Sequence, residues 1–158
     1  MKKKLELMMQ KVKNILCECP CGSTKFYLKK PPFVRFYCHC EICQKLYNSA
    51  YNDVVVIKSK NVVLKQNGVQ FNKYRRPPAL DRGICEKCKK PVAGFFRGIP
   101  GLRLAFINSD NIQDKSSLTR PLGHIFYHRK KEYVEDELPK FRGYWRSQIK
   151  VCHWIMAK

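Results

Sequence analysis

The sequence predicts a mainly β domain, built of small antiparallel sheets that bound metal holds together, with a few short helices. Two observations lead to this fold class. Apolar residues fall in short runs that either alternate with polar residues or are rich in β-branched side chains, and turn residues separate the runs. Nine cysteines occur in 158 residues, most of them in closely spaced groups. A chain of this length is expected to form one domain.

The expected strands are short and are recognised by alternation or by β-branched runs. Phe26 and Leu28 alternate with lysines, and a second strand leads directly into a group of three cysteines. The β-branched run Val54-Val55-Val56-Ile57 predicts a buried strand. The predicted strands are 25–29, 33–37, 54–57, 102–107 and 125–127.

One β-hairpin is also expected. Residues 62–66 and 69–74 flank Asn67-Gly68, a strong short-range hairpin signal, so they are predicted to pair with each other. Residues 41–47 are expected to form a short helix or turn, and the tail at 149–157 has no clear period.

The N-terminal segment 1–16 has apolar residues at helical spacing with lysines between them. We interpret it as a basic amphipathic extension ahead of a single domain at 17–158. Glu6 and Lys11 interrupt any apolar stretch long enough for an export signal. The expected location is therefore the cytoplasm, where cysteines stay reduced and bind metal instead of forming disulfides.

The composition is strongly basic. Lys and Arg total 32 against 12 Asp and Glu, which gives a formal net charge of +20. Such a charge favours anionic partners, including nucleic acid, acidic proteins and acidic small molecules. The basic residues are spread along the chain, however, which fits a solvated surface equally well.

The central motif is a cysteine triplet, Cys38, Cys40 and Cys43, spaced C-x-C-x-x-C. Cysteines at i and i+2 of an extended segment point to the same side, and the x-x-C that follows turns the chain back toward them. Thiolates suit zinc, which takes four ligands in a tetrahedron. Either a distant residue closes this site, or the fourth position is left to water and substrate, as a catalytic zinc requires.

A second group of cysteines predicts a closed structural zinc site. The C-x-x-C pair near residue 85 needs another pair, and Gly22 places a tight turn directly after Cys21. The predicted ligands are Cys19, Cys21, Cys85 and Cys88. The alternative is that Cys17 and Cys19, in place of Cys19 and Cys21, bind this metal together with Cys85 and Cys88.

Several residues remain open at this point. Cys17, Cys152 or a histidine could close the triplet as a second structural zinc, and an iron–sulfur cluster would also use thiolates, although its usual spacing differs. His39 lies between two triplet cysteines, so it is expected to point away from the metal. His124 and His128 are expected to be strand or surface residues.

These motifs resemble the glutathione-dependent formaldehyde-activating enzyme family, which includes centromere protein V. The resemblance runs from about residue 17 to residue 141. It depends on the order Cys19-x-Cys21-Gly22, Cys38-His39-Cys40-x-x-Cys43 and Cys85-x-x-Cys88, followed by Pro121-x-x-His124-Ile125-Phe126 and Asp136-x-Leu138-Pro139-x-Phe141.

The resemblance implies a β-tent fold and two zinc ions per chain. One would be structural, on Cys19, Cys21, Cys85 and Cys88, and one would be open to a thiol substrate, on Cys38, Cys40 and Cys43. It also implies carbon–sulfur lyase activity on S-hydroxymethylglutathione, the adduct of glutathione and formaldehyde.

The chain departs from the family pattern beside both sites. Family members usually have an arginine directly after the triplet, followed by a small residue and a glycine. This chain has Gln44-Lys45-Leu46-Tyr47-Asn48 in that place. Lys89 replaces the glycine that usually follows the C-x-x-C pair. Two functions are therefore expected: a zinc-dependent lyase acting on a thiol adduct or, as the alternative, a non-catalytic basic zinc module. The module would contact nucleic acid, a cytoskeletal polymer or another acidic partner.

Overall fold

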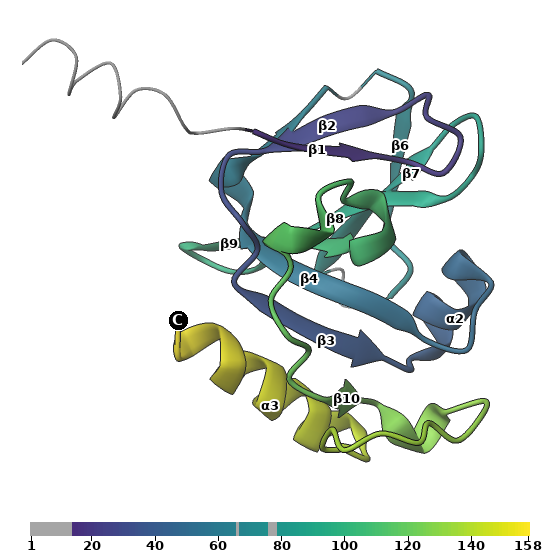
Figure 1. Ribbon diagram of the computed structural model, residues 1–158, viewed down its shortest axis with the longest axis vertical. Helices are drawn as coiled ribbons and strands as arrows, with labels where there is room; N and C mark the ends of the chain where they lie inside the picture. Colours follow the sequence, from purple (N-terminus) through teal and green to yellow (C-terminus); the bar gives the residue numbers. More distant parts are fainter. Residues whose placement is uncertain (1–13, 66, 76–78) are drawn as a thin grey trace, which may run out of the picture.

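The computed structural model describes residues 14–65, 67–75 and 79–158. This part of the chain forms ten β-strands in two sheets, accompanied by two α-helices (Figure 1). The small sheet has the order β1-β2-β5, with strands Ile15–Glu18, Lys25–Leu28 and Val62–Leu64. The large sheet has the order β10 (His124–Ile125), β3 (Val34–Cys38), β4 (Asn52–Lys58), β9 (Leu102–Asn108), β8 (Pro91–Ile99), β7 (Leu80–Cys85) and β6 (Val69–Asn72). The helices are α2 (Glu41–Tyr47) and α3 (Tyr144–Met156), and 3-10 turns occur at Ser59–Asn61, Ser109–Asn111, Lys115–Ser117 and Tyr127–Arg129. The predicted mainly β class is confirmed.

The large sheet is covered on both faces, which explains why β4 is a continuous apolar run. Val55 and Ile57 face a core shared with the small sheet, which also contains Phe26 and Leu28. Val54 and Val56 face a second core on the other side, closed by Val151 and Trp154 of α3. Successive side chains of a strand point to opposite faces, so a strand covered on both faces needs apolar residues at every position.

Most predicted strands are confirmed, with small shifts at their ends. The segments around Phe26, Phe36, Val55 and Leu104 become β2, β3, β4 and β9. The strand expected at 125–127 is shorter, because β10 ends at Ile125 and a 3-10 turn begins at Tyr127. β10 pairs in parallel with β3, so the large sheet is mixed and not purely antiparallel.

The predicted hairpin across Asn67-Gly68 is wrong. The chain does turn there, with Gly68 at φ 78°, but β5 pairs with β2 in the small sheet and β6 pairs with β7 in the large one. Asn67-Gly68 therefore determines only that the chain turns there. Which strand each neighbouring segment pairs with depends on the core that the segment covers.

The two ends of the chain also differ from the sequence-based picture. Of the expected N-terminal extension, residues 1–13 lie outside the described residues, and Ile15 and Leu16 belong to β1 instead of a helix. Most of the tail at 149–157, which has no clear period, belongs to the 13-residue helix α3, and this helix begins earlier in the chain. The strands β7 and β8 were not predicted. Among the described residues, neither helix combines the length and the apolar character needed to cross a membrane.

Candidate metal centres

The first candidate metal centre lies where the two sheets meet. Its four thiols are Cys19, Cys21, Cys85 and Cys88, and all their sulfur atoms lie within 4.8 Å of one another. The first two occupy the turn between β1 and β2, and the other two occupy the turn between β7 and β8. All nine cysteines of the chain lie in the described ranges and are free thiols.

The sulfur spacing in this centre fits zinc. Cys19 Sγ lies 3.4 Å from Cys21 Sγ and 3.7 Å from Cys85 Sγ, and Cys21 Sγ lies 3.9 Å from Cys85 Sγ. A tetrahedron with Zn–S bonds of about 2.3 Å has sulfur–sulfur edges of about 3.8 Å. The four thiols could therefore take up zinc with little movement.

Backbone turns hold these thiols in place. The Gly22 amide donates to the Cys19 carbonyl at 2.8 Å, and Gly22 adopts φ 71°, which glycine tolerates without steric cost. The Thr24 amide donates to Cys19 Sγ at 3.3 Å. In the second turn Lys89 adopts φ 58°, a conformation that costs a lysine far more than a glycine.

The second centre is the triplet Cys38, Cys40 and Cys43, whose sulfur atoms also lie within 4.8 Å of one another. Cys38 is the last residue of β3, and Cys40 is the N-cap of α2, where its sulfur accepts a hydrogen bond from the Cys43 amide at 3.4 Å. The end of a strand and the first turn of the next helix thus bring three local thiols together. The extended step from Cys38 to Cys40 is the one that the spacing predicts.

No fourth ligand closes the triplet among the described residues, because no other His, Cys, Asp or Glu joins its group. Cys17 is fully buried in the core beneath the small sheet, where burial raises the pKa of its thiol to about 12. Cys152 lies on α3 outside the group.

Hydrogen bonding within the triplet favours the ionised form of the Cys40 thiol. Hydrogen bonds from Cys38 and Cys43 lower the pKa of the Cys40 thiol, and Arg82 adds to this effect. Cys43 is held from another side by the Asn52 amide, which donates to Cys43 Sγ at 3.9 Å and whose oxygen accepts from Asn108. These contacts favour an anionic sulfur within the triplet.

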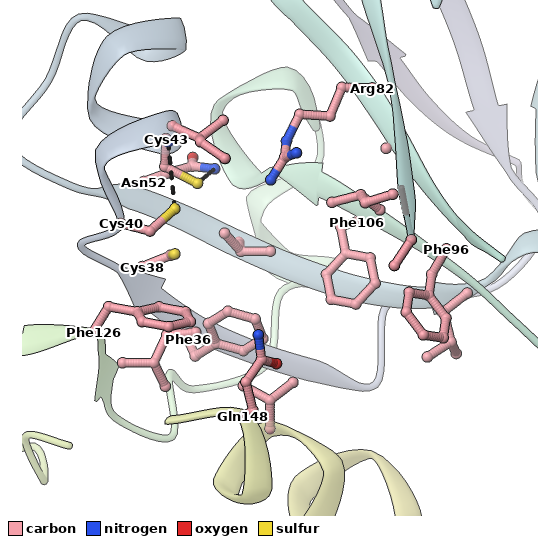
Figure 2. A pocket seen from close by; sticks show the side chains of 18 of the residues that line it. Phe36, Cys38, Cys40, Cys43, Asn52, Arg82, Phe96, Phe106, Phe126 and Gln148 are labelled. Carbon is pink, nitrogen blue, oxygen red and sulfur yellow. Dashed lines mark hydrogen bonds between the residues drawn. The ribbon is translucent and has the colours of Figure 1, made fainter. Parts of the chain in front are cut away.

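The triplet opens into a cavity of about 330 Å³ between the large sheet and α3. Figure 2 shows the three cysteines at one end of it, with phenylalanines along the walls and Gln148 entering from α3. Arg82 extends from β7 toward Cys43 and Asn52. Sequence reasoning missed Arg82, Asn52 and Gln148, because their side chains reach the cavity only through the packing of β7, β4 and α3 around it.

Beside the triplet, His39 does point away from the sulfur group, into a buried chain of polar side chains. The Nε2 atom of His39 lies 2.9 Å from Nδ1 of His124, and Nε2 of His124 lies 2.8 Å from an Asp136 oxygen. Burial, and then the neighbouring His124, lower the pKa of His39 to about 4, so its ring is neutral at pH 7. His124 is a strand residue, as predicted, and the 3-10 residue His128 accepts from the Gly143 amide.

The residues that replace the usual family residues have structural partners. The Gln44 amide is buried and donates to the carbonyl oxygens of His39 and Arg129, both at 2.9 Å. Asn48 ends α2 at φ 49°, which asparagine adopts more readily than most non-glycine residues. Both residues therefore support the backbone beside the triplet.

Comparison with known proteins supports the family resemblance. The family model described as glutathione-dependent formaldehyde-activating enzyme matches residues 14–129. None of the curated proteins matches the chain. A crystal structure of a Rhodobacter sphaeroides protein is 12% identical, covers 68% of this chain and 97% of its own, and has a TM-score of 0.50, so it shares the fold alone. The kinship with centromere protein V stays a prediction. Because the family match covers well over half of the chain, the chain belongs to the glutathione-dependent formaldehyde-activating enzyme family.

Proposed function

We propose that the protein is a zinc-dependent carbon–sulfur lyase that joins or splits a thiol–aldehyde adduct such as S-hydroxymethylglutathione. Cys19, Cys21, Cys85 and Cys88 would hold a structural zinc, and the triplet would hold a second, catalytic zinc. The observation that carries the proposal is the incomplete thiol set. Three sulfurs lie together at the end of a cavity, with no fourth protein ligand among the described residues.

An incomplete set of this kind suits chemistry at the metal. When bound by three thiols, zinc keeps a position for a substrate atom, lowers the pKa of a coordinated thiol and polarises an oxygen. Four thiols in a complete tetrahedron leave no such position, which favours a structural role for the first centre. The two centres therefore differ in ligand number, and we assign their roles on that difference.

The proposed reaction needs no oxidant or reductant. In the splitting direction the adduct hydroxyl loses its proton, the C–O bond becomes a carbonyl, and the electron pair of the C–S bond leaves on sulfur. The products are an aldehyde and a thiol, and the reverse reaction joins them. The Asn52 amide favours the anionic sulfur, because it donates to Cys43 Sγ and is directed toward the triplet (Figure 2).

The test is turnover of S-hydroxymethylglutathione and other hydroxymethyl thiols by zinc-loaded protein. Cys40→Ala should abolish turnover because it removes a triplet thiol. The matched control is Cys17→Ala, which removes a buried thiol from the opposite core and should keep activity. No turnover by loaded wild-type protein, or equal turnover by Cys40→Ala, would contradict the proposal.

The net charge of +20 favours a second candidate, a non-catalytic zinc module that contacts nucleic acid or another polyanion. Its affinity for a duplex oligonucleotide should fall steeply as salt rises, but remain measurable at physiological ionic strength. Affinity confined to low salt would leave only non-specific attraction and would remove this candidate.

A further inference from the structure

The cavity beside the triplet has a mainly apolar wall. With a volume of about 330 Å³ it is at the small end of ligand sites in proteins. The wall combines side chains from β3, β4, β8, β9 and the segment after β10: Phe36, Val54, Phe96, Leu104, Phe106 and Phe126. Aromatic and aliphatic side chains in such a wall favour a ligand with an apolar body.

The permanently charged side chains in the described lining are all positive. The described lining residues include two arginines and no Asp, Glu or Lys. The Arg75 guanidinium stacks over the Tyr144 ring at 4.3 Å. Arg82 makes no ion pair with a described residue, is only partly exposed, and extends toward the triplet (Figure 2). A half-buried guanidinium that has no carboxylate partner among the described residues is well suited to bind a carboxylate through paired hydrogen bonds.

This lining is a poor match to a tripeptide thiol. Glutathione carries two carboxylates, an ammonium group and two peptide units. The described lining offers no carboxylate to pair with the ammonium. Burying that group against phenylalanine without a partner would be unfavourable. The replacement of the usual arginine by Gln44, whose amide is occupied by two carbonyl oxygens, provides no further charge for a second carboxylate.

We propose that the triplet site takes an apolar mercaptocarboxylate, a thiol with one carboxylate near its sulfur and an aryl or branched alkyl body, in place of glutathione. The thiol would lie at Cys38, Cys40 and Cys43, the carboxylate on Arg82 and the body against Phe36, Phe96 and Phe106. This assignment rests on the proposed lyase function, since it names the thiol half of the adduct that is formed or split.

Calorimetric titration of zinc-loaded protein tests the assignment without a need for turnover. The probes are 2-mercapto-3-phenylpropanoate, 2-phenylethanethiol, which lacks the carboxylate, and glutathione. We expect the mercaptocarboxylate to bind at least tenfold more tightly than glutathione. Arg82→Gln should weaken the mercaptocarboxylate about tenfold and leave 2-phenylethanethiol within about twofold. Arg103→Gln, on the exposed side of β9, is the matched control and should change neither.

A second variant covers the apolar wall. Phe96→Ala, at a partly buried position, should weaken both phenyl probes and leave glutathione unchanged. Glutathione binding as tightly as the mercaptocarboxylate would overturn the assignment. So would an Arg82→Gln protein that loses affinity equally for both phenyl probes.

Turnover then separates this assignment from the lyase function. Turnover of S-hydroxymethylglutathione together with weak binding of the phenyl probes would keep the function and reject the substrate class. Tight, Arg82-dependent binding of 2-mercapto-3-phenylpropanoate without turnover of any hydroxymethyl adduct would keep the binding site and reject the lyase.

Discussion

Lys89→Gly should stabilise the protein, although it removes a charged residue next to a metal centre. Lys89 lies in the turn between β7 and β8, with φ 58° and an exposed side chain. A non-glycine residue in the left-handed region costs roughly 1–2 kcal/mol, whereas the extra flexibility of glycine in the unfolded chain costs about 0.5–1 kcal/mol. The difference is a net gain of about 0.5–1 kcal/mol.

For a domain of this size such a gain raises Tm by about 1–4 °C. The assay is thermal and urea unfolding of zinc-loaded wild type, Lys89→Gly and Lys89→Ala. Alanine removes the charge but keeps Cβ, so the alanine variant should not be stabilised. The reasoning is refuted if Lys89→Gly is less stable than wild type, because the lysine charge near four thiolates would then outweigh the backbone strain. Equal gains from glycine and alanine would refute it too, by tracing the gain to the charge.

Three further outcomes are expected. Cys38→Ser should lower bound zinc from about two ions to about one, as metal analysis will show, and should keep cooperative unfolding in urea. Cys85→Ser should lose cooperative unfolding in urea. Gln44→Ala should destabilise the protein by about 1–3 kcal/mol in urea unfolding, because it leaves two carbonyl oxygens without their buried donor, while the exposed Gln113→Ala should have little effect. Burial raises the pKa of Asp136, but hydrogen bonds from Lys140 and His124 outweigh it and lower the pKa to about 2, from an ordinary 3.8. The ionised carboxylate therefore stabilises the fold above about pH 4, and this contribution is lost as pH falls toward 2. The difference in urea midpoint between wild type and Asp136→Asn should accordingly stay constant from pH 5 to 8 and shrink below pH 4.

The sequence predicts best what depends on nearby residues. β4 is visible as a β-branched run because both of its faces are buried, and the triplet is visible because its three thiols are local. The C-terminal helix was missed because it carries apolar residues on two sides. Val151 and Trp154 face the core, while Trp145, Ile149 and Met156 are 74%, 66% and 85% exposed, so no single stripe stands out.

Long-range partners could not be predicted in the same way. Asn67-Gly68 specifies a turn, but whether the strands beside it pair with each other depends on which core each strand covers. The cavity is another case, since Arg82 reaches it only through the order of strands in the large sheet. The structure does bring together the same four and the same three thiols that the spacing groups, while their metal content stays a prediction.

The two thiol groups differ in what a bound metal would do for folding, and this difference explains how one can be left open. Cys19 and Cys85 are 66 residues apart, so a metal there closes a long loop between the two sheets. The triplet lies within about six residues, and closing so short a loop removes less chain entropy. Since loop entropy grows as (3/2)RT ln n, the long closure is worth about 2 kcal/mol more. If both groups bind metal as proposed, the fold would depend more on the complete centre, and the triplet could exchange its fourth ligand at a smaller cost to the fold.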